Sequence, residues 1–311
     1  MLYAPIMKLQ RRHKIIIIIS TLLFFGATAA LFSYYHPSEP NLKIFFLDVG
    51  QGDSILIETP NKQIILIDGG PDNSLLPKLA HYLPWLSHHI DYVILTHPHA
   101  DHLIGLVEVL KRYDVGQIIG TNLAYRDGTY TTFLNIIKSK HIPFNMVHYG
   151  ESLNFSPDCF FKILHPLNAE TFNKYVNLNN ASVVGQLNCE QRKILFTGDI
   201  ENSEAEKIYD AGIDLKSDIL KVSHHGSIQG NDFNFLEKIG APIGVISVGA
   251  NNKYGHPNKE ALINMQKLAM KILRTDQLGD ITIIIKNGFI LTKNCNNSPV
   301  DKLGIDKCFI T

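Results

Sequence analysis

The densest group of metal-binding side chains in the chain lies in Thr96-His97-Pro98-His99-Ala100-Asp101-His102. It follows Tyr92-Val93-Ile94-Leu95, an apolar run that predicts a buried strand. A loop that leaves a strand here can turn its imidazoles and carboxylate inward around a pair of cations. These ligand types favour zinc, manganese or iron over calcium. A polar surface turn that holds three histidines is the weaker alternative, because the ligands are dense and the flanking residues are those of a buried strand.

Length and composition allow a large hydrophobic core. The chain has 311 residues, enough for one large domain or two small ones, and 45% of them are hydrophobic. Its formal net charge is +0, so no global field attracts nucleic acid, although a local basic groove is compatible with this balance. The cysteines form no CxxC pair, which excludes a zinc ribbon. They are Cys159, Cys189, Cys295 and Cys308.

The first forty residues carry a predicted targeting signal. An apolar run over residues 15–32, close to the ~20 residues of a spanning helix, follows Lys8, Arg11, Arg12 and Lys14. This pattern predicts a single pass through the cytoplasmic membrane, with the basic tip inside and the catalytic domain outside. A signal peptide cleaved near Ala27-Thr28-Ala29 is the alternative, and it would leave the domain secreted or periplasmic. In an oxidising compartment, Cys295 and Cys308 could close the C-terminal tail as a loop.

Short strands come in two batches, each followed by helices. This order predicts two sheets packed face to face with helices outside, and it disfavours a doubly wound parallel sheet, in which strands and helices alternate. Asn287-Gly288 between apolar runs predicts a hairpin near the end. We expect residues 1–40 to form the basic tip, the anchor or signal segment and a linker, residues 41–293 the catalytic domain, and residues 294–311 a tail.

The ends of later predicted strands supply further candidate ligands. Asp199 closes the run Leu195-Phe196-Thr197-Gly198-Asp199, in which the glycine allows a close backbone approach. His224 and His225 close the next strand, and Asp68 ends an earlier strand before two glycines. Each residue alone has an ordinary explanation as a turn acid or a surface histidine. Together with residues 97–102 they favour a dinuclear hydrolase.

Seven motifs occur in an order that resembles the metallo-β-lactamase superfamily. The resemblance is to the branch that contains the C-terminal, extracytoplasmic hydrolase domain of the competence protein ComEC. FLDVGQGDS and HHGS are specific to this branch, whereas HxHxDH marks only the superfamily. The motifs are FLDVGQGDS (46–54), DGG (68–70), HPHADH (97–102), NNASVV (179–184), LFTGD (195–199), KVSHHGS (221–227) and YGHP (254–257).

The resemblance implies an αββα sandwich, the metallo-β-lactamase fold, with two divalent metal ions, zinc or manganese, at one edge. His97 and His99 would bind the first metal, and Asp101 and His102 the second. Asp199 would bridge the two ions, and His225, in preference to His224, would complete the second site. Asp68 would orient a histidine from behind.

Two features depart from this pattern or extend it. Many superfamily members have another ligand histidine where Asn179-Asn180 stands here, so Asn180 is a candidate for the site or its surroundings. His165 is a weaker candidate, since it lies in a Leu-His-Pro loop. His256, in a glycine-proline loop, could protonate the leaving group, bind a metal or cap the next helix.

The resemblance favours metal-assisted hydrolysis of a phosphodiester, with DNA outside the membrane as the substrate and Asp101 and His256 as catalytic residues. Asp199 at the bridge, where common β-lactamases have cysteine, argues against a β-lactamase site. The alternatives are a phosphorylcholine esterase, a thioester or lactone hydrolase, or a non-enzymatic component of a DNA-uptake complex. A role in competence would require a separate channel partner. The aromatic residues that could stack on bases are Tyr125, Tyr130, Phe133 and Tyr254.

Overall fold

The computed structural model describes residues 14–28, 41–84, 87–121, 123–168 and 177–294. Contacts divide the chain into two units, Met1–Pro40 and Asn41–Thr311. In the first unit, residues 14–28 form a helix. No helix among the described residues is long and apolar enough to cross a membrane. The remaining residues of the predicted anchor or signal segment, Cys295, Cys308 and the rest of the tail lie outside the described residues.

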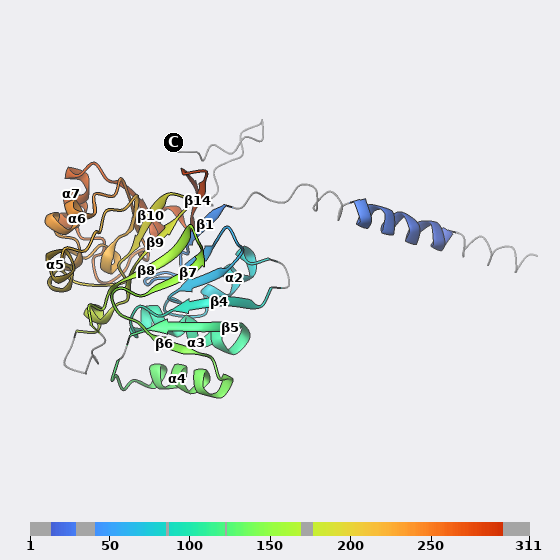
Figure 1. The fold of residues 1–311 in the computed structure, drawn as a ribbon, viewed down its shortest axis with the longest axis horizontal. Coiled ribbons are helices and arrows are strands. Elements are labelled where there is room, and N and C mark those ends of the chain that lie inside the picture. Colours follow the sequence, from blue (N-terminus) through green and yellow to red (C-terminus); the bar gives the residue numbers. More distant parts are fainter. Residues whose placement is uncertain (1–13, 29–40, 85–86, 122, 169–176, 295–311) are drawn as a thin grey trace, which may run out of the picture. The chain divides into compact units, whose positions relative to one another are not determined.

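The first sheet has eight strands in the order β15-β14-β1-β2-β3-β4-β5-β6 (Figure 1). Its β14–β1–β2–β3 part is antiparallel, and β3 to β6 run parallel. β2 and β3 are buried at every position, because one face meets the second sheet and the other is covered by helices. The strands are β1 (Leu42–Phe46), β2 (Ile55–Glu58), β3 (Ile64–Ile67), β4 (His89–Ile94), β5 (Asp114–Gly120), β6 (Phe144–Met146), β14 (Ile281–Lys286) and β15 (Phe289–Asn294).

The second sheet has seven strands in the order β13-β12-β11-β10-β9-β8-β7. Its antiparallel half, β7 to β10, is followed by the parallel strands β11 to β13. The strands are β7 (Ser152–Ser156), β8 (Cys159–His165), β9 (Val184–Cys189), β10 (Arg192–Phe196), β11 (Ile219–Lys221), β12 (Ile243–Ile246) and β13 (Lys271–Arg274).

Three apolar layers hold the sandwich together. The central core lies between the sheets, where the rings of Phe46, Phe161 and Phe196 stack. The first sheet's outer face packs against α2, α3 and α4, and the second sheet's outer face against α5, α6 and α7. The prediction of two sheets with helices outside is confirmed, as is the hairpin at Asn287-Gly288. The helices are α2 (Leu75–Tyr82), α3 (Ala100–Arg112), α4 (Gly128–Lys140), α5 (Asn202–Asp210), α6 (Phe233–Ile239), α7 (Lys259–Lys267) and α8 (Thr275–Leu278).

A disulfide joins Cys159 to Cys189, which are paired neighbours on β8 and β9. The sequence did not predict this pairing. The bond closes a segment of 30 residues, which restricts the unfolded chain. We expect reduction to lower the free energy of unfolding by about 2–4 kcal/mol. Urea unfolding with and without a thiol reductant measures the change. The Cys159→Ala/Cys189→Ala variant should not respond to reductant, and equal wild-type midpoints in both conditions would contradict the expectation.

Candidate metal centre

The candidate site lies where the ends of strands from both sheets meet. The loops after β3, β4, β10 and β11 carry the polar residues, and the β1–β2 loop approaches from the side. Gly69 explains why these segments come so close. A Cβ atom on Gly69 would lie 2.3 Å from the Leu106 amide nitrogen of α3, so only glycine allows the end of β3 to touch this helix. That contact brings Asp68 beside the first turn of α3.

Asp68 fixes the orientation of His102. Its carboxylate accepts hydrogen bonds from the Thr96 amide at 2.8 Å and the Thr96 hydroxyl at 2.6 Å. The same carboxylate lies 2.8 Å from Nδ1 of His102. The His102 ring therefore turns its Nε2 toward Asp199, whose Oδ2 is 3.2 Å away. Buried carboxylates commonly hold metal-binding histidines in this way.

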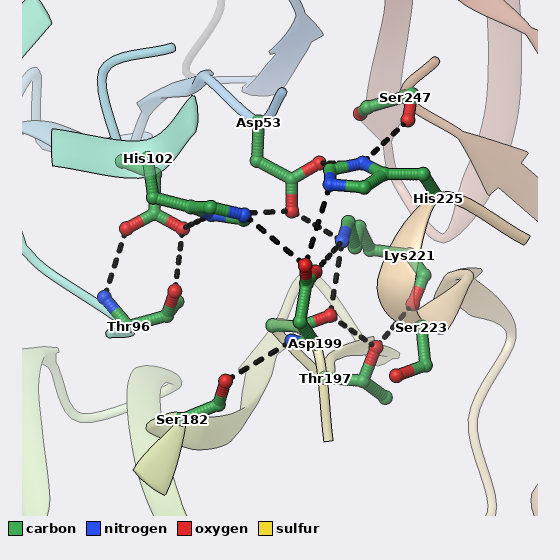
Figure 2. A network of polar contacts seen from close by, with 12 residues as sticks. Asp53, Thr96, His102, Ser182, Thr197, Asp199, Lys221, Ser223, His225 and Ser247 are labelled. Carbon is green, nitrogen blue, oxygen red and sulfur yellow. Dashed lines mark hydrogen bonds and ion pairs between the residues drawn. The ribbon is translucent and has the colours of Figure 1, made fainter. Parts of the chain in front are cut away.

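Four side chains converge on one point: Asp101, His102, Asp199 and His225 (Figure 2 labels all but Asp101). Their ligand atoms lie within 4.8 Å of one another. Nε2 of His225 is 3.3 Å from both Asp101 Oδ2 and Asp199 Oδ2. The Asp199 backbone amide donates to the Ser182 hydroxyl at 3.1 Å, which positions the main chain that carries this carboxylate.

This cluster fits a divalent cation. Nδ1 of His225 donates to the Ser247 carbonyl at 2.9 Å, so in the neutral ring Nε2 carries a lone pair. That Nε2 is buried, and among the described residues it has no hydrogen-bond partner. A lone pair that faces two carboxylates is unfavourable unless a positive charge lies between them. A proton or a divalent cation can supply that charge, and imidazole with carboxylate is the donor set of zinc and manganese sites.

His97 and His99 lie beside this cluster. Nε2 of His97 is 3.0 Å from Nδ1 of His99, and the His97 ring centroid is 4.2 Å from that of His102. Burial, followed by the charge of His102, holds the pKa of His97 well below its usual range, and burial also lowers the pKa of His99. Both rings are therefore neutral near pH 7, which is the form that binds a metal.

The two asparagines have different surroundings. Asn179 lines the cleft over the site, and its side-chain amide donates to Glu201 Oε1 at 3.0 Å. Asn180 uses both ends of its amide at the start of α5, donating to Ser203 and accepting from the Glu201 amide. The structure thus places Asn179, and not the predicted Asn180, against the site. His165 lies against the Ser182 carbonyl and Glu204.

Asp53 and Lys221 form a buried ion pair behind the cluster, and sequence reasoning gave neither a role. Lys221 Nζ also donates to the Gly198 carbonyl at 3.0 Å and lies 3.5 Å from Asp199 Oδ1, while Asp53 Oδ1 is 3.4 Å from Nδ1 of His225. Burial disfavours the charge of Lys221, but Asp53 and Asp199 outweigh it and raise its pKa. The sequence feature that could have pointed to this ion pair is a lysine inside the apolar run Ile219-Leu220-Lys221-Val222, where a charge needs a buried partner.

His224 and His256 line a cleft of about 350 Å³ that opens over the cluster. Nδ1 of His256 is buried, with no hydrogen-bond partner within the described part of the chain. Burial, followed by the charges of His224 and His225, lowers the pKa of His256 to about 4, so its ring is neutral at pH 7. The capping alternative for His256 is wrong, because the Asn258 side chain caps α7.

The pKa values of His102 and His225 behave in the opposite way. Burial alone would lower both pKa values. The carboxylates of Asp199, Asp68 and Asp101 outweigh it at His102, and those of Asp199 and Asp53 outweigh it at His225. Both pKa values are therefore raised well above 6.5. In the metal-free protein these protons stabilise the fold fully below the unfolded pKa, and this stabilisation is lost as the pH rises through the folded values. A cation that binds both rings must displace the protons.

We therefore expect the affinity for Mn²⁺ or Zn²⁺ to rise with pH and binding near pH 7 to release up to about two protons. Calorimetry in buffers of different ionisation enthalpy counts the released protons. Binding that releases no protons and has the same affinity at pH 6 and pH 8 (about a hundredfold change in proton concentration) would contradict this expectation.

Comparison with known proteins agrees with the architecture. A model of the metallo-beta-lactamase superfamily matches residues 47–134. The metallo-beta-lactamase fold protein YhfI of Bacillus subtilis superposes with a TM-score of 0.50 at 14% identity, covering 81% of this chain and 100% of that one. The domain has the metallo-β-lactamase fold. The resemblance inferred from the sequence is therefore confirmed. The αββα sandwich that it implied agrees with the described sheets and helices.

The curated relatives include competence proteins. ComE operon protein 3 of Bacillus subtilis is 28% identical over 265 residues, covering 79% of this chain and 33% of the relative. Competence protein ComA of Neisseria gonorrhoeae is 24% identical over 246 residues, covering 78% of this chain and 32% of the relative. The chain thus spans about a third of the length of these relatives.

The fold alone does not identify the reaction. A variant of the CmlA beta-hydroxylase superposes on this domain with a TM-score of 0.51 at 14% identity, covering 82% of this chain and 56% of that one. Its name is that of a hydroxylase, so the function has to be argued from the site.

Proposed function

We propose that this domain is a metal-dependent phosphodiesterase that cleaves DNA. The observation that carries the proposal is the convergence of Asp101, His102, Asp199 and His225 on one point, with the neutral pair His97 and His99 beside it. These six candidate ligands, with Asp199 as the acid that both groups can share, suit two cations. The kinship with competence proteins favours DNA among phosphodiesters.

Under this proposal His97 and His99 would hold one zinc or manganese ion, Asp101, His102 and His225 would hold the other, and Asp199 would serve both. Such ions supply Lewis-acid stabilisation of phosphoryl charge and a water of lowered pKa. The chain's own residues orient and neutralise the centre. Asp68 and Thr96 fix His102, and Lys221 balances the buried carboxylates of Asp53 and Asp199.

Asp101 and His256 face the reacting groups in this proposal. The Asp101 side chain is 31% exposed at the cleft, so its carboxylate can accept a hydrogen bond from an attacking water and orient it. Burial opposes ionisation of Asp101, but His102 and His225 hold its pKa below its usual range. His256, neutral at pH 7, offers either a metal ligand or a hydrogen bond to the leaving oxygen, but not an imidazolium acid.

The proposal includes a location outside the cytoplasmic membrane, with the N-terminal segment as a single-pass anchor or a cleaved signal. The Cys159–Cys189 disulfide supports this location, because disulfides persist mainly in oxidising compartments. A role in DNA uptake would also need a competence channel as partner.

The test incubates the full chain with single-stranded DNA or bis(p-nitrophenyl) phosphate, with Mn²⁺ or Zn²⁺, beside an Asp101→Ala/Asp199→Ala variant. Metal-dependent DNA cleavage that is lost in the variant is the expected result. Turnover of the small diester alone would favour a small-substrate hydrolase. No turnover of either substrate would overturn the proposal and favour the thioester, lactone or non-enzymatic alternatives.

A further inference from the structure

The rim of the cleft carries an exposed aromatic residue that the proposed reaction does not use. Tyr254 lies in the loop of residues 249–257, which follows β12, and it lines the cleft together with His256. Tyr254 is 59% exposed, whereas two other aromatic residues predicted to stack on bases, Tyr130 and Phe133, are in the core. An exposed tyrosine on the wall of a cleft is available to a ligand.

Asn252 holds this loop in shape. Its side-chain amide donates to the carbonyls of Gly249 at 3.0 Å and His256 at 2.7 Å, and its oxygen accepts from the amides of Tyr254 and His256. The Gly249 amide donates to Gln51 Oε1 at 3.1 Å, which ties the loop to the β1–β2 loop. Tyr254 is therefore presented from a fixed backbone, which lowers the entropic cost of binding.

A chain of ring contacts leads from Tyr254 to the candidate metal centre. Its ring is nearly parallel to that of His256, with centroids 6.1 Å apart and an interplanar angle of 15°. The centroid of the His256 ring lies 5.6 Å from that of His224, and the centroid of the His224 ring lies 6.0 Å from that of His225. Tyr254 also lines the same cleft as Asp101 and Asp199, so a strand with a phosphate at the metal centre would have a neighbouring nucleotide beside Tyr254.

Lys253 adds a positive charge at the same place. Its Nζ lies 5.2 Å from the centroid of the Tyr254 ring. Stacking of a base on an aromatic side chain outweighs a cation–π contact at an exposed site, so a base can displace the ammonium from the ring. The displaced ammonium is then free to contact a phosphate.

We propose that Tyr254 is a stacking platform for an unpaired nucleobase, with Lys253 beside it for a phosphate of the same strand. The inference rests on the proposed function and makes it specific, since a base must be unpaired to lie on the ring. Single-stranded DNA is therefore the substrate form that this rim selects.

The test measures binding of a fluorescent thymidine oligonucleotide to the full chain by anisotropy, without added divalent cations, so that it is independent of cleavage. We expect Tyr254→Ala to weaken binding about tenfold and Tyr254→Trp to retain it. An abasic oligonucleotide with the same number of phosphates is the reference substrate, because nitrophenyl esters could also stack. Tyr254→Ala should not weaken binding of this abasic strand.

Tyr149→Ala is the matched control. Tyr149 is 40% exposed and Lys162 Nζ lies 5.9 Å from the centroid of its ring, but Tyr149 does not line the cleft. Its affinity should equal that of the wild type. Equal thymidine binding by Tyr254→Ala and wild type, or an equal loss on the abasic strand, would overturn the inference. Absence of DNA cleavage by the wild type would instead count against the proposed function, and the binding result would stand separately.

Discussion

Replacing Asp199 with asparagine is expected to lower DNA cleavage by at least about 10²–10³-fold and to reduce bound metal. The carboxylate lies within 3.5 Å of His102, His225 and Lys221, so it is the shared acid of the site. Asparagine keeps the size of the side chain but removes the negative charge that a cation between the two histidines requires. Metal content by elemental analysis and kcat/KM on single-stranded DNA measure the effect.

Asp210→Asn is the matched control, because Asp210 is an exposed acid at the end of α5. It should retain wild-type metal content and activity. Thermal unfolding of both variants checks that the fold survives. An Asp199→Asn protein that keeps its metal and more than about a tenth of its activity would show that Asp199 is not the shared acid.

Replacing Lys221 with methionine is expected to lower the free energy of unfolding by about 3–5 kcal/mol. The ammonium is almost fully buried between Asp53 and Asp199. Its loss therefore removes the lysine charge that both buried carboxylates share and leaves only the protonated His102 and His225 to balance the buried acids. Methionine preserves most of the apolar volume, which separates the effect of charge from that of a cavity. Urea unfolding of the metal-free protein measures the difference.

Two further variants make this expectation specific. Lys193 pairs with Asp214 at 2.9 Å on the surface, so Lys193→Met should change stability by only about 0–1 kcal/mol. Adding Asp53→Asn to Lys221→Met should restore part of the loss, because it removes one of the buried negative charges that lost its lysine partner. Equal stabilities of the Lys221→Met variant and the wild type would contradict the proposed balance of charge.

Local patterns in the sequence determined most of the architecture. The apolar run before His97 forms β4, and the spacing of Leu103, Leu106 and Leu110 forms the buried face of α3. These elements were predictable because their signals, burial and periodicity, are carried by neighbours in the chain. The metal-binding residue types at the ends of β4, β10 and β11 were visible for the same reason.

Only the tertiary structure decided which of these residues meet. The resemblance favoured His225 over His224 as a ligand, but the meeting of His225 with Asp101 and Asp199 depends on how the end of β11, where both histidines have positive φ angles, packs against α3 and the end of β10. Asp53 and Lys221 are 168 positions apart, and their pairing depends on how the β1–β2 loop approaches the second sheet. Cys189 bonds Cys159 because β8 and β9 pair in that register. Such contacts depend on how distant elements pack, for which a single sequence holds no local signal.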